Sequence, residues 1–261
     1  MTTLHRAERV VLAALLAGGT IVLEVTAVAE PQAPAGPPTA ELAEPAESAE
    51  LDSFPGPSEL DCAGRVAQRV QAHYEQIADF EADFEQSTQS VALGSGSAGS
   101  EVARGKVIMA KPGKMRWEYA EPQESWVLSD GVNLWIYDVV AGEAQHLVAS
   151  GGYLSGAALQ FLMGRGVIAE DFVVTSGKCT SELAVVELEL TPRAPASYER
   201  LGLRVDPRSG EVKSTTLVDL FGNRTTISFH SVRVNRSPDP GLFRFDAPPG
   251  VDVIELTPTT E

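Results

Sequence analysis

Residue types that could support catalysis are scattered along this 261-residue chain. Hydrolysis needs either a nucleophile held by a base or several metal ligands at a fixed spacing. The histidines lie far apart and match no ligand spacing: His5, His73, His146 and His230. The sequence also contains no G-x-S-x-G, H-E-x-x-H or C-x-x-C motif. We therefore expect no enzyme, no cofactor and no metal ion.

Two further patterns could bind an ion or a nucleotide. Four acidic residues alternate with apolar ones: Asp79, Glu81, Asp83 and Glu85. Such a cluster could hold a metal ion, but strict alternation is typical of the solvated face of a strand. Residues Gly94–Gly99 match G-x-G-x-x-G, yet a nucleotide site needs a helix after this motif, and a strand-like run follows instead. We interpret it as a flexible connection between two strands.

The charge of the chain is strongly negative. The net charge is −16 and the isoelectric point is near 4.7, which argues against a nucleic-acid partner bound through phosphates. Residues 30–60 are rich in Pro, Ala and Glu and contain no Lys or Arg. Such a segment buries too little apolar surface to offset its ordering entropy. We expect it to be a disordered acidic tether.

The N-terminus has the pattern of a secretory signal peptide. Arg6 and Arg9 precede the apolar run Val10–Leu23, and Ala27-Val28-Ala29 is a small-x-small cleavage site. The run is too short to span a bilayer core of about 30 Å, although an uncleaved anchor is the alternative. We expect residues 1–29 to direct export. In an oxidising compartment, Cys62 and Cys179 are then expected to pair.

Residues 61–261 have the pattern of one mainly β domain. Residues 61–78 have apolar residues at helical spacing, and the runs that follow alternate with period two. Three such runs fall within 104–138, where Asp130-Gly131 predicts a hairpin with a type I′ turn. Five more fall between 172 and 235. The pattern predicts about eleven short antiparallel strands in one curved sheet or open barrel.

A short apolar segment interrupts the strands. Residues 151–166 are bracketed by glycines and place Leu154, Phe161 and Leu162 on one helical stripe. A glycine-hinged apolar helix inserted into a sheet protein could be a movable lid. An ordinary packing helix is the alternative.

Four short motifs follow one another through the folded part of the chain. They are F-x-A-x-F-x-Q at 80–86, G-x-V-x-x-x-K-P-x-x-x-R-W-x-Y-x-x-P at 105–122, S-D-G-x-x-L-W-x-Y-D at 129–138 and F-x-F-x-x-P-x-G-V-D-V-I at 243–254. In this order they resemble the periplasmic lipoprotein carriers of the LolA-like family. The resemblance covers essentially all of residues 62–261.

The resemblance implies an unclosed antiparallel β-barrel with an N-terminal helix and an apolar cavity under a short helical lid. It implies a non-catalytic periplasmic carrier, which takes acylated lipoproteins from an inner-membrane lipoprotein-releasing ABC transporter to a LolB-like outer-membrane acceptor. We expect a monomer. The residues expected to line the acyl-chain cavity are Phe80, Phe84, Val107, Met109, Met115, Trp117, Tyr119, Leu154, Phe161 and Leu162.

One position departs from the family's pattern. Its carriers place an arginine before the proline of the second motif, where it bonds to the lid, and this chain has Lys111. Lysine keeps the charge but lacks the planar fork, so we expect Lys111 to gate the lid more weakly or differently. Two other functions stay open on the same fold: an envelope module that senses lipids or lipoproteins, and a carrier of another lipid. An envelope hydrolase would need an acid–base set that the sequence does not show.

Overall fold

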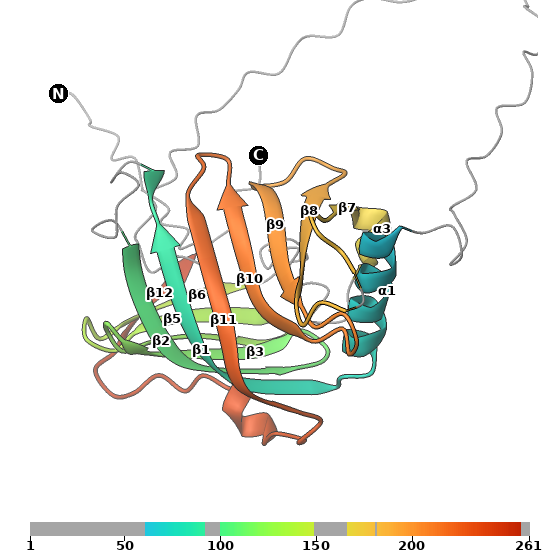
Figure 1. The fold of residues 1–261 in the computed structure, drawn as a ribbon. Helices are drawn as coiled ribbons and strands as arrows, with labels where there is room; N and C mark the ends of the chain where they lie inside the picture. Colours follow the sequence, from blue (N-terminus) through green and yellow to red (C-terminus); the bar gives the residue numbers. More distant parts are fainter. Residues whose placement is uncertain (1–60, 92–99, 149–165, 181, 257–261) are drawn as a thin grey trace, which may run out of the picture.

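A computed structural model describes residues 61–91, 100–148, 166–180 and 182–256, which form one twelve-stranded sheet (Figure 1). The strand order is β12-β6-β5-β4-β3-β2-β1-β11-β10-β9-β8-β7. The elements are α1 (Cys62–Glu75), β1 (Asp79–Gln89), β2 (Ser100–Ala110), β3 (Lys114–Glu121), β4 (Ser125–Asp130), β5 (Asn133–Asp138), β6 (Glu143–Val148), α3 (Ile168–Asp171), β7 (Phe172–Thr175), β8 (Val186–Pro192), β9 (Tyr198–Val205), β10 (Val212–Asp219), β11 (Arg224–Val234), the 3₁₀ helix η3 (Pro240–Phe243) and β12 (Asp252–Leu256).

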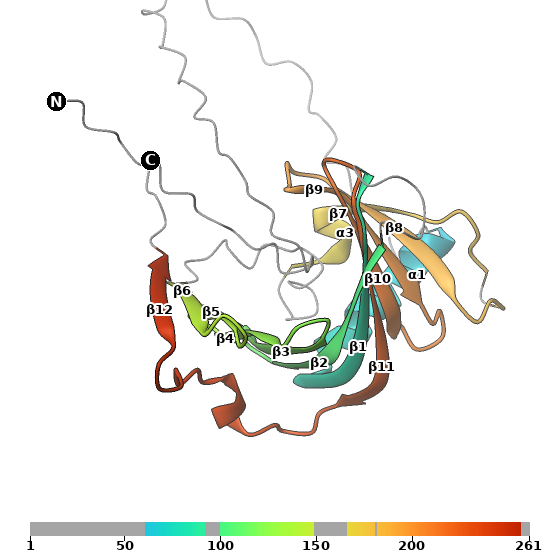
Figure 2. The ribbon, with the colours of Figure 1, turned by 90° about the vertical axis from the view of Figure 1, so that its left-hand side faces the viewer.

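The sheet bends into an open trough (Figure 2). Its two edge strands, β7 and β12, do not pair with each other, so the predicted unclosed barrel is confirmed. The described ranges contain twelve strands, where the sequence predicted about eleven. It also differs at the C-terminal edge, because β12 pairs with β6 in parallel. The chain reaches that edge by crossing the outside of the sheet, so β12 arrives in the same direction as β6 (Figure 2).

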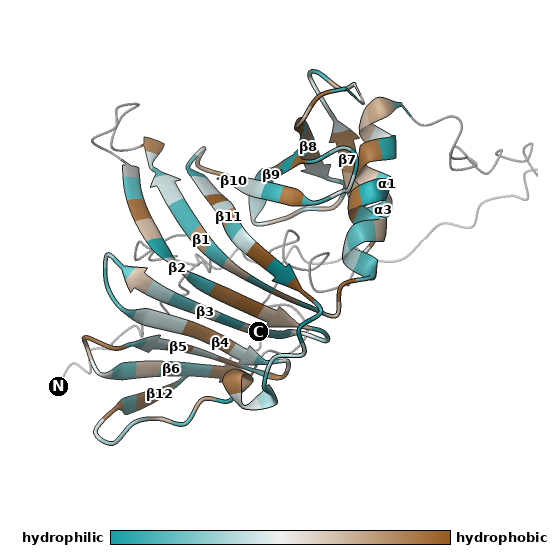
Figure 3. Ribbon diagram, turned by 60° about the horizontal axis from the view of Figure 1, so that its bottom comes forward, coloured by the Kyte–Doolittle hydropathy of each residue, from teal (hydrophilic) through white to brown (hydrophobic). Residues whose placement is uncertain are grey.

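The two faces of the trough can be told apart by the C-terminal segment. Helix η3 lies on the outer, convex side (Figure 2), and the Arg116 Nη1 atom donates a hydrogen bond of 3.0 Å to the Leu242 carbonyl oxygen. Side chains alternate along a strand, so Met115 and Trp117 point to the inner, concave side. Registered partners on neighbouring strands share a face, and the same assignment therefore extends across the sheet. Figure 3 shows hydrophobic and hydrophilic residues alternating along the strands.

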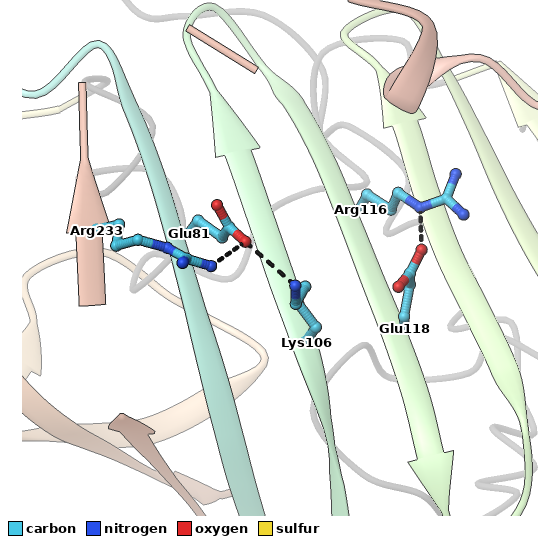
Figure 4. A network of polar contacts seen from close by, with 5 residues as sticks. All are labelled: Glu81, Lys106, Arg116, Glu118 and Arg233. Atoms are coloured by element: carbon cyan, nitrogen blue, oxygen red, sulfur yellow. Dashed lines mark hydrogen bonds and ion pairs between the residues drawn. The ribbon is translucent and has the colours of Figure 1, made fainter. Parts of the chain in front are cut away.

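The convex face of β1, β2 and β11 carries an ion-pair network (Figure 4). Glu81 Oε1 accepts hydrogen bonds from Lys106 Nζ at 3.2 Å and from Arg233 Nη2 at 2.6 Å. Glu85 pairs in the same way with Arg104. Two of the four alternating acidic residues thus neutralise basic neighbours. Among the described residues, no three His, Cys, Asp or Glu side chains gather as metal ligands would.

Asp79, the first acidic residue of that series, behaves differently from the sequence expectation. It is buried, and its carboxylate accepts hydrogen bonds from the backbone N–H groups of Arg236 at 2.6 Å and Ser237 at 3.0 Å. These two groups follow the end of β11, far away in sequence. Asp79 therefore fixes the start of the C-terminal segment rather than facing solvent.

Helix α1 closes one end of the trough (Figure 1). Asp61 caps it by accepting a hydrogen bond from the Gly64 N–H at 2.7 Å. Val66, Val70 and Tyr74 are buried, as their helical spacing predicted. The β9–β10 turn meets the helix at Gly210, where an added Cβ would lie 2.3 Å from the Arg69 carbonyl oxygen.

The Asp130-Gly131 hairpin between β4 and β5 is confirmed, but its turn is not type I′. Gly131 has a positive φ of 100°, whereas a type I′ turn needs two positive φ values in succession. The Asp130 side chain stabilises the turn by accepting hydrogen bonds from the backbone N–H groups of Val132 and Asn133. Asx-type side-chain bonding thus replaces the second left-handed residue.

Cys62 and Cys179 form a disulfide bond between α1 and the loop after β7. The two cysteines are 117 residues apart in sequence. The bond links α1 to the edge of the sheet that β7 forms. Closing so long a loop should restrict the unfolded chain considerably.

We expect loss of this disulfide to lower the free energy of unfolding by roughly 4–5 kcal/mol, since the crosslink mainly constrains the unfolded state. The measurement is urea denaturation of the wild type with and without reductant. A Cys62→Ala/Cys179→Ala double variant is the control and should resemble the reduced wild type in both conditions. Equal stability of oxidised and reduced wild type would contradict the expectation.

The Glu81 network should make stability depend on acid. Partial burial raises the pKa of Glu81, but the bonds from Lys106 and Arg233 outweigh it and hold the pKa below its ordinary value. The stabilisation is therefore present above pH 4.5 and is lost as the pH falls through the folded-state value. Glu81→Gln should cost about 0.5–1 kcal/mol at pH 7. If the difference in free energy of unfolding between wild type and Glu81→Gln were the same below pH 3 as at pH 7, this linkage would be disproved.

Candidate functional site

The concave face of β1, β2 and β3 is lined by buried apolar side chains. The register aligns Phe80 with Met109 and Met109 with Met115 in one row across the strands. The next row holds Val107 and Trp117. Each of these side chains is at most 7% exposed. The sequence-predicted lining residues of β1–β3 thus lie on one face of the sheet, with Phe84 and Tyr119 completing the set.

Contacts between aromatic rings link β1 and β3 on this face. The Phe84 ring packs edge-on against Trp117 at 4.9 Å and against Tyr119 at 5.1 Å between ring centroids. Gly105 lies beneath these rings, where an added Cβ would come within 1.8 Å of the Glu118 carbonyl oxygen and 3.0 Å of Phe84. Only glycine lets the strands and the ring approach this closely.

The apolar face continues over strands that the sequence prediction did not assign to the site. Val127, Leu134 and Leu147 are buried on the same side of β4, β5 and β6. On the other arm of the trough, Phe229 of β11 meets the Phe80 ring at a centroid distance of 5.5 Å. The alternation of the β4 and β5 sequences was the signal that could have revealed these residues. They belong to the same apolar cluster as the β1–β3 residues.

A few polar groups lie within this apolar face. The Tyr119 hydroxyl donates a hydrogen bond of 3.2 Å to Gln86 Oε1, and Gln86 is buried. Burial raises the pKa of Tyr119, which keeps the phenol neutral. Within the described part of the chain, two buried side-chain atoms have no hydrogen-bond partner, Trp117 Nε1 and Gln145 Oε1. The face can therefore hold apolar groups, together with a small number of hydrogen-bonding ones.

Lys111 lies at the junction between the sheet and α1. Its ammonium donates a hydrogen bond of 2.6 Å to the carbonyl oxygen of Tyr74, in the last turn of the helix. Its backbone N–H also donates to the Ala78 carbonyl oxygen at 2.9 Å. Partial burial lowers the pKa of the ammonium, and Glu75 opposes that shift. Lys111 thus fastens the β2–β3 turn to the end of α1.

The predicted lid lies outside the described residues, except for Gly166. Leu154, Phe161 and Leu162 therefore have no described position. The glycine motif at 94–99 is also outside, but the antiparallel strands β1 and β2 flank it, as expected of a strand connection. None of the helices in the described ranges has both the length and the apolar character needed to cross a membrane.

Sequence comparisons with known proteins point to one family. Residues 75–246 match the family described as "Outer membrane lipoprotein carrier protein LolA". The outer-membrane lipoprotein carrier protein of Cupriavidus pinatubonensis is 31% identical over 152 residues, covering 58% of this chain and 69% of that protein. Its counterpart in Pseudomonas aeruginosa is 32% identical over 162 residues, covering 62% and 76%.

Among solved structures, the LolA superfamily protein of Nitrosomonas europaea covers 71% of this chain and 99% of its own, at 13% identity and a TM-score of 0.39. The family match spans more than half of the chain, and relatives above 30% identity are covered over more than two thirds of their length. Proteins of this family are carriers rather than enzymes. This chain belongs to the LolA family of outer-membrane lipoprotein carrier proteins.

Proposed function

We propose that this protein carries acylated lipoproteins across the periplasm by holding their acyl chains against the concave face. The observation that carries the proposal is the mainly apolar lining that runs from Phe80 on β1 to Leu147 on β6. Burying one CH₂ group contributes about 0.8 kcal/mol, so a few acyl chains can supply a large affinity without any catalytic group. Met109 and Met115 add unbranched side chains that adapt to chains of different shape.

The other segments of the chain are consistent with a carrier that is exported to the periplasm. Residues 1–29 would direct export, and the acidic segment 30–60 would tether residues 61–261, the carrier domain. The Cys62–Cys179 disulfide suits an oxidising compartment such as the periplasm. The protein would act as a monomer, receiving cargo from an inner-membrane ABC transporter and delivering it to an outer-membrane acceptor of the LolB type.

The function is tested by release of lipoproteins from inner-membrane vesicles that contain the transporter. Wild-type protein should move lipoproteins into the soluble fraction, and Trp117→Asp should reduce release at least tenfold, because it places a charge among apolar groups. Trp117→Phe, which keeps an apolar ring, should retain most of the release.

A matched control uses the neighbouring strand. Trp126 lies on the convex face of β4, edge-on against the Tyr137 ring and under the Arg116 guanidinium. Trp126→Asp should leave release near the wild-type rate if it folds, as judged by circular dichroism. Undiminished release by folded Trp117→Asp, or equal losses in both variants, would argue against the concave face as the binding site.

Lys111 is proposed to help hold the carrier closed, with residues 151–166 as the moving lid. Its bond to Tyr74 shows that the ammonium stabilises the end of α1, and a charged hydrogen bond of this kind contributes about 1.5–3 kcal/mol. We infer that loosening this junction with α1 also favours lid opening, by a free energy small enough for acyl chains to supply. Lys111→Leu should favour the open state, retain cargo longer and slow transfer to the acceptor.

The measurement is the transfer rate from a purified carrier–lipoprotein complex to the acceptor, together with hydrogen exchange over α1 and residues 151–166. Lys111→Arg is the control, because it keeps a charged donor and should keep closure. If Lys111→Leu altered neither transfer nor exchange, Lys111 would have no part in gating.

A further inference from the structure

Two buried polar atoms on the concave face lack the partner that buried polar atoms normally have. In the described part of the chain, neither the Trp117 Nε1 atom nor the Gln145 Oε1 atom forms a hydrogen bond, and Trp117 is only 2% exposed. Native proteins leave few such groups unpaired, because each costs the free energy of its lost hydration. A group kept in this state calls for a ligand that pairs it.

The two atoms belong to one row of the sheet. Trp117 is registered with Val127, Val127 with Ile136, and Ile136 with Gln145. All four side chains therefore lie on the concave face of four successive strands, and three strand spacings separate the first from the last, which is roughly 14 Å across the sheet. Between them stand only the apolar side chains of Val127 and Ile136.

Other buried polar groups of the same face are already paired. The Tyr119 hydroxyl bonds to Gln86, and the Ser129 hydroxyl accepts a hydrogen bond of 3.1 Å from the Gly131 N–H. Among the side chains that the structure describes, the unpaired state is therefore particular to Trp117 and Gln145.

The chemistry of the two atoms is complementary. An indole N–H only donates, and a side-chain amide oxygen accepts. Hydrocarbon chains offer neither an acceptor nor a donor. The part of a lipoprotein anchor where acyl chains join glycerol and cysteine offers both, since ester carbonyls accept hydrogen bonds and the N-acyl amide N–H donates one.

We propose that Trp117 donates a hydrogen bond to an ester carbonyl of the bound lipid anchor and that Gln145 accepts one from its amide N–H. This inference rests on the proposed carrier function. It adds recognition of the anchor's ester and amide groups to the burial of its acyl chains. It makes the protein selective for ester- and amide-linked acyl groups over hydrocarbon of equal length. Trp117 thereby fills two roles, apolar lining through its ring and recognition through its N–H.

The test compares the dissociation constants of three synthetic lipopeptides of equal chain length for wild type, Trp117→Phe and Gln145→Met. The first is triacylated, with two ester groups and one amide. The second replaces the esters with ethers, and the third carries an N-methylated amide. Binding is followed by displacement of a fluorescent fatty acid. Comparing ratios between ligands within each variant removes the loss of packing, because that loss affects all three ligands alike.

Wild type should bind the ester lipopeptide roughly three- to tenfold more tightly than the ether analogue, the effect of one neutral hydrogen bond. Trp117→Phe should bring that ratio to about one, and Gln145→Met should leave it unchanged. The preference for the N–H amide over the N-methyl amide should disappear in Gln145→Met and remain in Trp117→Phe. Ester and ether affinities that keep their ratio in Trp117→Phe would overturn the inference.

The outcomes separate the inference from the carrier function. If wild type bound all three lipopeptides tightly and equally, acyl-chain binding would stand and the polar recognition would be wrong. If it bound none of them and released no lipoprotein from vesicles, the carrier function itself would fail.

Discussion

The strict alternation of side chains along β1, β2 and β3 is the constraint on which the rest of the structure depends. It places Phe84, Met109 and Trp117 on the concave face and the Glu81 network on the convex face. A shift of one residue in register would exchange the two sets and place charges on the apolar face. Ion pairs on the convex face are exposed to water, whereas the buried side chains described on the concave face of β1–β3 are uncharged and suit an apolar ligand.

An unclosed sheet also needs something to hold its curvature, and the C-terminal segment supplies it. This segment crosses the convex face, where Phe243 is buried and Phe245 packs against the rings of Trp135 and Tyr137. Asp79 fixes its start, and β12 fixes its end by pairing with β6. The outer surface is therefore braced along the strands whose inner surface forms the apolar lining. A braced sheet can present that lining without closing into a barrel.

The sequence predicted those features that depend on local pattern. Period-two alternation gave the faces of β1–β3, and turn residues gave the hairpin at Asp130-Gly131. It did not reveal the burial of Asp79 or the parallel pairing of β12. Both depend on where the chain returns after more than a hundred residues, which no local pattern encodes. The partner of Lys111 was missed as well, because Tyr74 lies 37 residues away in sequence and meets Lys111 only once α1 has packed against the sheet. That the Trp117 Nε1 and Gln145 Oε1 atoms lack hydrogen-bond partners could not be predicted either, because it depends on the strand register that surrounds them with apolar neighbours.

The three tryptophans allow a direct test of the central claim that acyl chains lie against the concave face. Trp117 is concave, whereas Trp126 and Trp135 lie on the convex face with Arg116 and Phe245. Brominated acyl chains quench tryptophan fluorescence only on contact. The measurement is quenching of a Trp126→Phe/Trp135→Phe variant and of a Trp117→Phe variant by a lipopeptide with brominated chains. The account predicts strong quenching in the first variant and little in the second; quenching that persists in Trp117→Phe and is absent from the other would contradict it.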